Sequence, residues 1–133
     1  MRARHVLGDE RGSSPVEFVL VGALLTALTL AVLQVAFAVY VRNVVHDAAV
    51  EGAHHAALAD TTPGEGVTRT QEVISRAIGA DYAEDVAIGQ DSSLGHPSVV
   101  VRVRTTLPVL GLIGIPQALE VSARAPVESF GEE

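Results

Sequence analysis

The longest stretch of the chain without a charged side chain runs from Phe18 to Val41. It holds 24 residues, and Gln34 is the only strongly polar one among them. At about 1.5 Å per residue, a helix of this length measures roughly 36 Å, which exceeds the thickness of about 30 Å of a bilayer's hydrocarbon core. The pattern therefore predicts a helix that spans a membrane.

Polar residues just before this stretch mark the start of the helix. Ser14-Pro15-Val16-Glu17 has the S-x-x-E spacing of a capping box, with proline at the first helical position. In that role the Glu17 carboxylate accepts a backbone N–H and complements the helix dipole. A lone carboxylate beside an apolar membrane helix is also costly and tends to have a function, so Glu17 is a candidate for a role beyond capping.

Nothing stops the helix at Val41. Residues 42–59 contain no proline and no turn cluster, and small or apolar residues recur at Val44, Ala48, Gly52 and Ala56. We therefore expect one continuous helix from about Pro15 to Ala59, with half of it in the bilayer and half outside.

Small residues also recur at helical spacing inside the membrane run. In lipid such residues allow two helices to approach closely, and a buried amide can hydrogen-bond across the contact. The candidate helix-packing residues are Ala23, Ala27, Ala31, Gln34 and Gly52. The abundance of alanine in this chain accounts for the same pattern, and the sequence leaves both explanations open.

The rest of the chain predicts a small domain of one short helix and about three antiparallel strands. Turn-forming residues over 60–66 end the long helix, and a short amphipathic helix is expected from about Thr68 to Ile78, with Thr68 as its cap. Strands are expected at 86–90, 98–106 and 119–125. The predicted fold class is α+β, with a long N-terminal transmembrane helix.

The last two strands alternate apolar and polar side chains. The predicted inward faces are Val99, Val101, Val103 and Thr105 on one strand, and Leu119, Val121, Ala123 and Ala125 on the other. Glu120 is expected to pair with Arg102 or Arg104 across the strands. The apolar segment 108–116 is predicted to form a hairpin connection or one turn of helix. Packing on the domain is favoured for it over docking on a neighbour or on lipid.

Composition and charge narrow the classes of function. The 133 residues carry a net charge of −7 and no Cys, and no basic patch occurs beyond residue 11. Nucleic-acid binding, disulfides and thiolate metal sites are therefore not expected. No His pair has i, i+4 spacing, and no G-x-S-x-G, Walker or dinucleotide motif occurs. We expect no enzymatic activity, no cofactor, no metal and no small-molecule substrate.

Arginines are unevenly placed around the membrane run, with Arg2, Arg4 and Arg11 before it and Arg42 after it. The positive-inside rule then predicts a cytoplasmic N-terminus and an external C-terminal part. Two ordinary alternatives remain. One is a signal peptide cleaved after Ala36-Phe37-Ala38, although the run exceeds the usual apolar length of about 7–15 residues. The other is a plain single-pass anchor.

Three features together resemble a prepilin: Arg11-Gly12, then Glu17 five residues beyond the glycine, then an apolar helix. The run Val16-Glu17-Phe18-Val19-Leu20 resembles the TadE family of the Tad (Flp, tight-adherence) pilus system. Residues 47–53, with their Glu-Gly-Ala core, are similar to a second stretch typical of this family. His54-His55 stand where members often carry Arg. The resemblance covers about residues 11–60.

The resemblance implies cleavage by a dedicated prepilin peptidase between Gly12 and Ser13, with Glu17 and Phe18 serving recognition or assembly. The expected plan is a cytoplasmic leader (1–12), a transmembrane helix (13–41), an extracytoplasmic helix extension (42–60) and a small α+β domain (61–133). The implied function is a minor pilin or pseudopilin in the cytoplasmic membrane or in a pilus. Its partners would be the membrane, other pilin subunits and the assembly platform. The alternative is a membrane-anchored extracytoplasmic binding module unrelated to pili.

Overall fold

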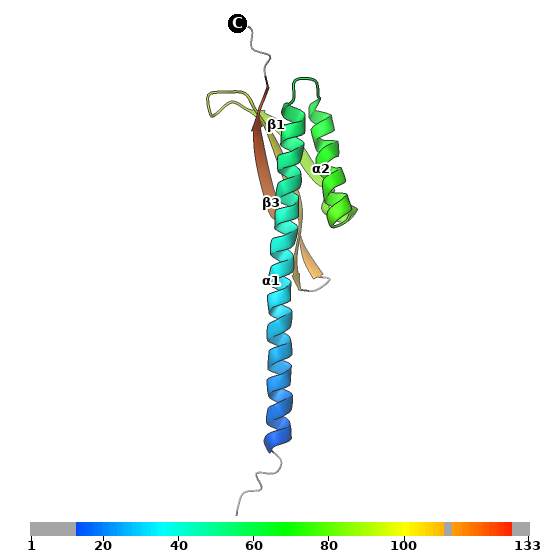
Figure 1. Ribbon diagram of the computed structural model, residues 1–133, viewed down its shortest axis with the longest axis vertical. Coiled ribbons are helices and arrows are strands. Elements are labelled where there is room, and N and C mark those ends of the chain that lie inside the picture. Colours follow the sequence, from blue (N-terminus) through cyan, green and yellow to red (C-terminus); the bar gives the residue numbers. More distant parts are fainter. Residues whose placement is uncertain (1–12, 111–112, 129–133) are drawn as a thin grey trace, which may run out of the picture. The chain divides into compact units, whose positions relative to one another are not determined.

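The computed structural model describes residues 13–110 and 113–128. The elements in chain order are α1 (Ser13–Ala57), α2 (Pro63–Ala77), a short 3-10 turn η2 (Ala80–Tyr82), β1 (Asp85–Asp91), β2 (Ser98–Leu110) and β3 (Ile113–Pro126), as Figure 1 shows. This arrangement confirms the predicted α+β class. The chain divides into two units, Met1–Leu33 and Gln34–Glu133.

The described part of the first unit is the N-terminal portion of α1. Every residue from Ser13 to Leu33 is exposed, including large apolar side chains such as Phe18 and Leu24. α1 is long and apolar enough to cross a membrane. A helix that is hydrophobic all round needs an apolar environment, and in this unit only lipid or other helices can supply it.

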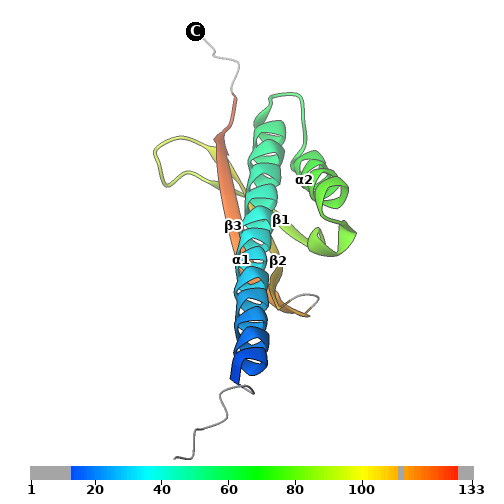
Figure 2. The same cartoon turned by 60° about the horizontal axis from the view of Figure 1, so that its bottom comes forward.

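The second unit contains the core. Along α1 the buried residues are Val41, Val45, Ala48, Ala49, Gly52, Ala53, Ala56 and Ala57. This stripe is wider than the single i, i+4 row expected from the sequence. It packs against the apolar face of the sheet, and Figure 2 shows this part of α1 lying across the sheet with α2 beside it. The small side chains on α1 allow the sheet and α2 to approach the helix together.

The sheet has the order β1-β2-β3, with antiparallel neighbours. Its register pairs Ile88 with Val101, and Val101 with Ala123. The predicted inward residues of β2 and β3 are buried, and the alternation expected from the sequence is confirmed. On the opposite face Glu120 accepts from Arg104 Nε at 2.9 Å and lies 3.1 Å from Arg102 Nε, so it pairs with both arginines.

The second helix begins earlier than predicted. α2 starts at Pro63, with Thr62 as its cap, and the prediction of a cap at Thr68 is wrong. The Thr62 backbone N–H donates to Glu65 Oε2 at 2.6 Å, and the Glu65 N–H donates to Thr62 Oγ1 at 3.4 Å. Proline at the first helical position completes this capping box, so a segment that reads as a helix breaker in fact starts a helix.

The apolar segment after Thr106 extends the two strands instead of forming a turn of helix. Leu107 pairs with Ile115, Pro108 with Gly114, and Leu110 with Ile113, with register shifts on both sides of Pro108. The hairpin connection expected here is confirmed, and the alternative of a helical turn is wrong for the described residues. Gly111 and Leu112 lie outside the described residues.

Candidate functional site

Glu17 is the charged side chain in the described part of the first unit. α1 begins at Ser13, so Ser14 lies inside the helix and is not its cap. The Ser13 hydroxyl donates to Glu17 Oε1 at 2.7 Å, because residues four apart lie one above the other on a helix. The predicted Ser14 capping box is therefore replaced by a Ser13–Glu17 contact. Gly12, the other half of the predicted processing site, lies outside the described residues.

The surroundings of Glu17 are apolar and open. Phe18 is 80% exposed. The hydroxyls of Thr26 and Thr29 donate to backbone carbonyls one turn earlier, at 2.8 Å each, so they need no partner from outside the helix. Among the described polar groups of this unit, the Glu17 carboxylate carries the charge and keeps most of its acceptor capacity.

The predicted helix-packing residues fall into two groups. Ala23, Ala27 and Ala31 are exposed in the first unit, where their faces are open to lipid or to a second helix. Gln34 is partly buried and belongs to the second unit. The structure does not bring these residues together with Gly52.

Gly52 packs inside the second unit, against α2. A Cβ on Gly52 would lie 1.8 Å from Thr70 Oγ1 and 2.7 Å from the Gly66 carbonyl oxygen. Both distances are shorter than those at which real Cβ atoms contact other atoms, so only glycine allows α1 and α2 to approach this closely. The helix that Gly52 contacts is therefore α2 of the same chain, and no pattern in the sequence indicated Gly66 as its partner.

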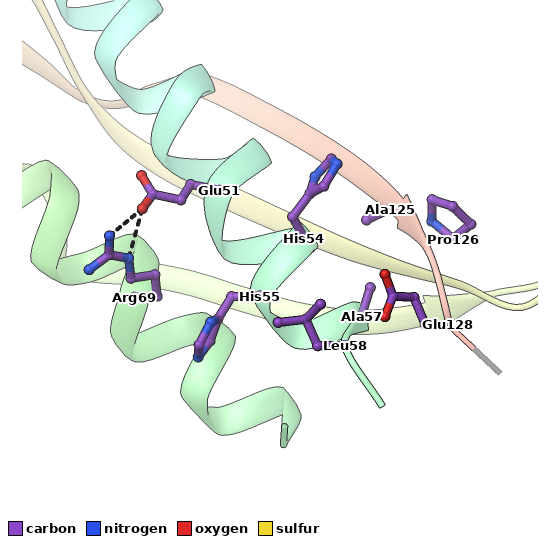
Figure 3. A pocket seen from close by; sticks show the side chains of 9 residues that line it. All are labelled: Glu51, His54, His55, Ala57, Leu58, Arg69, Ala125, Pro126 and Glu128. Carbon is purple, nitrogen blue, oxygen red and sulfur yellow. Dashed lines mark hydrogen bonds and ion pairs between the residues drawn. The ribbon is translucent and has the colours of Figure 1, made fainter. Parts of the chain in front are cut away.

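A surface pocket of about 520 Å³ lies where α1 ends, bounded by α2 and the end of β3 (Figure 3). Arg69 on α2 points toward Glu51 on α1, and its Nε donates to Glu51 Oε1 at 2.8 Å. At the far side, the Glu128 backbone N–H donates to the Ala57 carbonyl at 2.9 Å, which satisfies one carbonyl at the end of the helix. These contacts tie α1, α2 and the segment after β3 together.

The chemistry of this pocket is that of a structural junction. The charge of Glu51 is matched by Arg69, and the adjacent His54 and His55 side chains point in different directions, as Figure 3 shows. His54 Nδ1 lies 3.1 Å from the Val50 carbonyl oxygen of its own helix. Within residues 13–110 and 113–128, no group of three His, Cys, Asp or Glu side chains could hold a metal ion.

Two features of the second unit were not predicted from the sequence. The Thr62-Pro63-Gly64-Glu65 capping box was visible as a motif and could have placed the start of α2. The Glu51–Arg69 pair spans 18 positions and had no local signal.

The N-terminal part of the chain is similar to a known protein family. Residues 12–54 match the family described as TadE-like protein. The match confirms the resemblance predicted from Gly12, Glu17 and the Glu-Gly-Ala core, and it ends within the second unit. No curated protein and no solved structure matches the chain.

The TadE-like segment coincides with most of α1. It contains the whole of the charge-free run and the first part of the stripe that packs on the sheet. A TadE-like match, together with one helix among the described residues that is able to cross a membrane, fits a single-pass membrane protein in a pilus context.

Proposed function

We propose that this protein is a structural, non-enzymatic subunit of a Tad-type pilus: a membrane-anchored, prepilin-like minor pilin or pseudopilin. The observation that carries the proposal is the position of Glu17. It lies one turn beyond Ser13, at the start of a helix whose following side chains are apolar and exposed. Such a surface suits lipid before assembly and neighbouring helices afterwards.

Processing would create the partner that Glu17 needs. Cleavage between Gly12 and Ser13 by a prepilin peptidase leaves a new α-amino group on Ser13, which with a pKa near 8 is protonated at neutral pH. In a bundle of such helices, the amine of one subunit pairs with the Glu17 carboxylate of another. Either charge alone would be costly in an apolar bundle, and the pair relieves both costs.

The second unit then serves as the exposed head of the subunit. The arginine asymmetry around the membrane run supports a cytoplasmic N-terminus and an external C-terminal unit. The partners in this proposal are the prepilin peptidase, other pilin subunits and the assembly platform. The presence of this extra unit favours a minor pilin or pseudopilin over a major filament subunit.

The N-terminus of the protein recovered from membranes of its native host tests the proposal. Mass spectrometry should find Ser13 as the first residue. Gly12→Leu should leave the full-length precursor, because a side chain at the residue before the cut obstructs a tight peptidase site. Gly22→Leu is the matched control: it makes the same change where a Cβ would meet no atom within 4 Å, and it should be processed normally.

Any other N-terminal residue would indicate a different class of protein. A start at Val39 would mean signal-peptide cleavage, and an intact Met1 would leave a plain anchor that presents a binding module. Either result would contradict the pilin proposal.

A further inference from the structure

The Ser13 hydroxyl differs from the threonine hydroxyls of the same helix in the direction of its hydrogen bond. Thr26 and Thr29 each donate to the backbone carbonyl four residues earlier, at 2.8 Å. Hydroxyls in an apolar helix are commonly satisfied in this way, because lipid offers them no acceptor. Ser13 is the first residue of α1, so the carbonyl four residues earlier does not belong to the helix. Its hydroxyl donates forward instead, to Glu17 Oε1 at 2.7 Å.

This contact fixes the position of the Glu17 carboxylate. A free glutamate side chain samples many rotamers, and ordering it costs conformational entropy. On a helix, side chains lean toward the N-terminus, so that of Glu17 lies over Ser13, one turn earlier. With Oε1 held by the hydroxyl, the carboxylate stays beside the first residue of the helix. Oε2 remains able to accept a hydrogen bond from another group.

We propose that Ser13 is a positioning residue for the pair between Glu17 and the α-amino group of a neighbouring subunit. The inference rests on the proposed function, which supplies that amine. The Ser13 hydroxyl holds one carboxylate oxygen, and the other is thereby kept in place for the neighbour. The side chain of the residue after the cut then contributes to assembly, in addition to its amine.

The energetics of the contact favour this role. A hydrogen bond from a hydroxyl to a carboxylate is roughly twice as strong as one between neutral groups. The bond offsets part of the cost of bringing a carboxylate into an apolar bundle. The side chains that follow Glu17 are apolar and exposed, Phe18 among them, so they offer the carboxylate no hydrogen bond. The contribution of Ser13 should therefore be measurable as a loss of pairing when its hydroxyl is removed.

Carbodiimide cross-linking detects the pair directly, because the chain contains no lysine. In the processed protein the α-amino group of Ser13 is the only primary amine, so an amide bond between two copies must involve it. The carbodiimide activates a carboxylate, the amine attacks the activated carbonyl, and the reagent leaves as a urea. Membranes and pili of the native host should yield a dimer in which Ser13 is linked to Glu17, identified by tandem mass spectrometry.

Three variants isolate the hydroxyl. Ser13→Ala should lower the yield of this dimer about tenfold, as expected for the loss of a hydrogen bond to a charged group. Ser13→Thr keeps a hydroxyl and should restore the yield. Ser14→Ala is the matched control: it removes a hydroxyl from the next residue, whereas the contact with Glu17 is made by Ser13. Mass spectrometry of the N-terminus checks that every variant is processed.

The outcomes separate this inference from the proposed function. A wild-type dimer yield from processed Ser13→Ala would overturn the role of Ser13 and leave the pilin proposal intact. An equal loss in Ser14→Ala, or no rescue by Ser13→Thr, would overturn it as well, because the effect would not depend on this hydroxyl. If processed wild type gave no Ser13–Glu17 dimer, or a link only within one chain, the pair itself would be contradicted, and with it the proposed role of Glu17.

Discussion

Gly52 of α1 and Gly66 of α2 pack backbone to backbone. A Cβ on Gly52 would lie 2.7 Å from the Gly66 carbonyl oxygen, and a Cβ on Gly66 would lie 2.8 Å from that of Gly52. The contact is reciprocal, so each glycine allows the other helix to approach. It sets the distance between the helices that the Glu51–Arg69 pair then bridges.

A methyl group at either glycine should destabilise the second unit. Alanine in place of glycine stabilises a helix by about 1 kcal/mol, but overpacking a fixed contact costs about 1–3 kcal/mol. Because the obstructing atoms include backbone, we expect Gly52→Ala and Gly66→Ala to lower the free energy of unfolding of the full-length protein in detergent, followed by circular dichroism. Gly64→Ala, where the nearest atom is 4.0 Å away, is the control. Unchanged stability at 52 and 66 would contradict the close contact.

The cap of α2 should make the second unit sensitive to acid. The Thr62 backbone N–H and then the Thr62 hydroxyl donate to the Glu65 carboxylate and hold its pKa below the ordinary value of 4.5. A group with a lowered pKa stabilises the fold when ionised, and this contribution is lost as the pH falls through the folded-state pKa. Wild type should therefore be more stable than Glu65→Gln above pH 4.5.

The difference in stability between wild type and Glu65→Gln should shrink as the pH is lowered below 4.5. Thermal unfolding across this range checks it, with Glu84→Gln, at an exposed residue just before β1, as the control. A difference independent of pH would mean that the charge of Glu65 does not contribute.

Thr105 offers a stabilising substitution. Its side chain is only 4% exposed, and its hydroxyl has no hydrogen-bond partner in the described part of the chain. A buried polar group without a partner costs about 1–3 kcal/mol, so Thr105→Val should raise the free energy of unfolding by about 1 kcal/mol. Thr70→Val is the matched control, since the equally buried Thr70 hydroxyl donates to the Gly66 carbonyl at 2.9 Å. That variant should lose stability, and a loss in both would show that Thr105 does have a partner.

Glu17→Gln separates a local role from an assembly role. The variant keeps the shape and can still accept from the Ser13 hydroxyl, but it loses the charge. Removing one partner of a buried ion pair costs on the order of 3–5 kcal/mol, whereas a helix-end contact alone contributes about 1 kcal/mol. We expect normal insertion and cleavage but no assembled pili, measured by pilus yield. A wild-type pilus yield would mean that Glu17 acts only through a contact within its own helix.

Local patterns in the sequence were enough to place most of the elements. The charge-free run from Phe18 to Val41 and the absence of any breaker after it predicted the continuous helix, and strict alternation predicted the buried faces of β2 and β3. Both signals depend only on residues close together in the chain, because burial repeats with the period of the element itself. The start of α2 was a local signal too, and it was misread because proline and glycine both break helices and begin them.

The tertiary structure alone decided which distant segments meet. Gly52 reads as one more small residue in a stripe, and only the position of Gly66 makes it indispensable. Nothing in the sequence around Arg69 pointed to its partner, whereas the packing of α2 on α1 brings it to Glu51. The same holds for the apolar segment 108–116, whose sequence allowed a hairpin connection or a helical turn, packed on the domain or docked on a neighbour or on lipid. Its strand pairing continues the β2–β3 ladder that begins at Ser98 and Pro126, residues far apart in the chain, and periodicity does not encode such contacts.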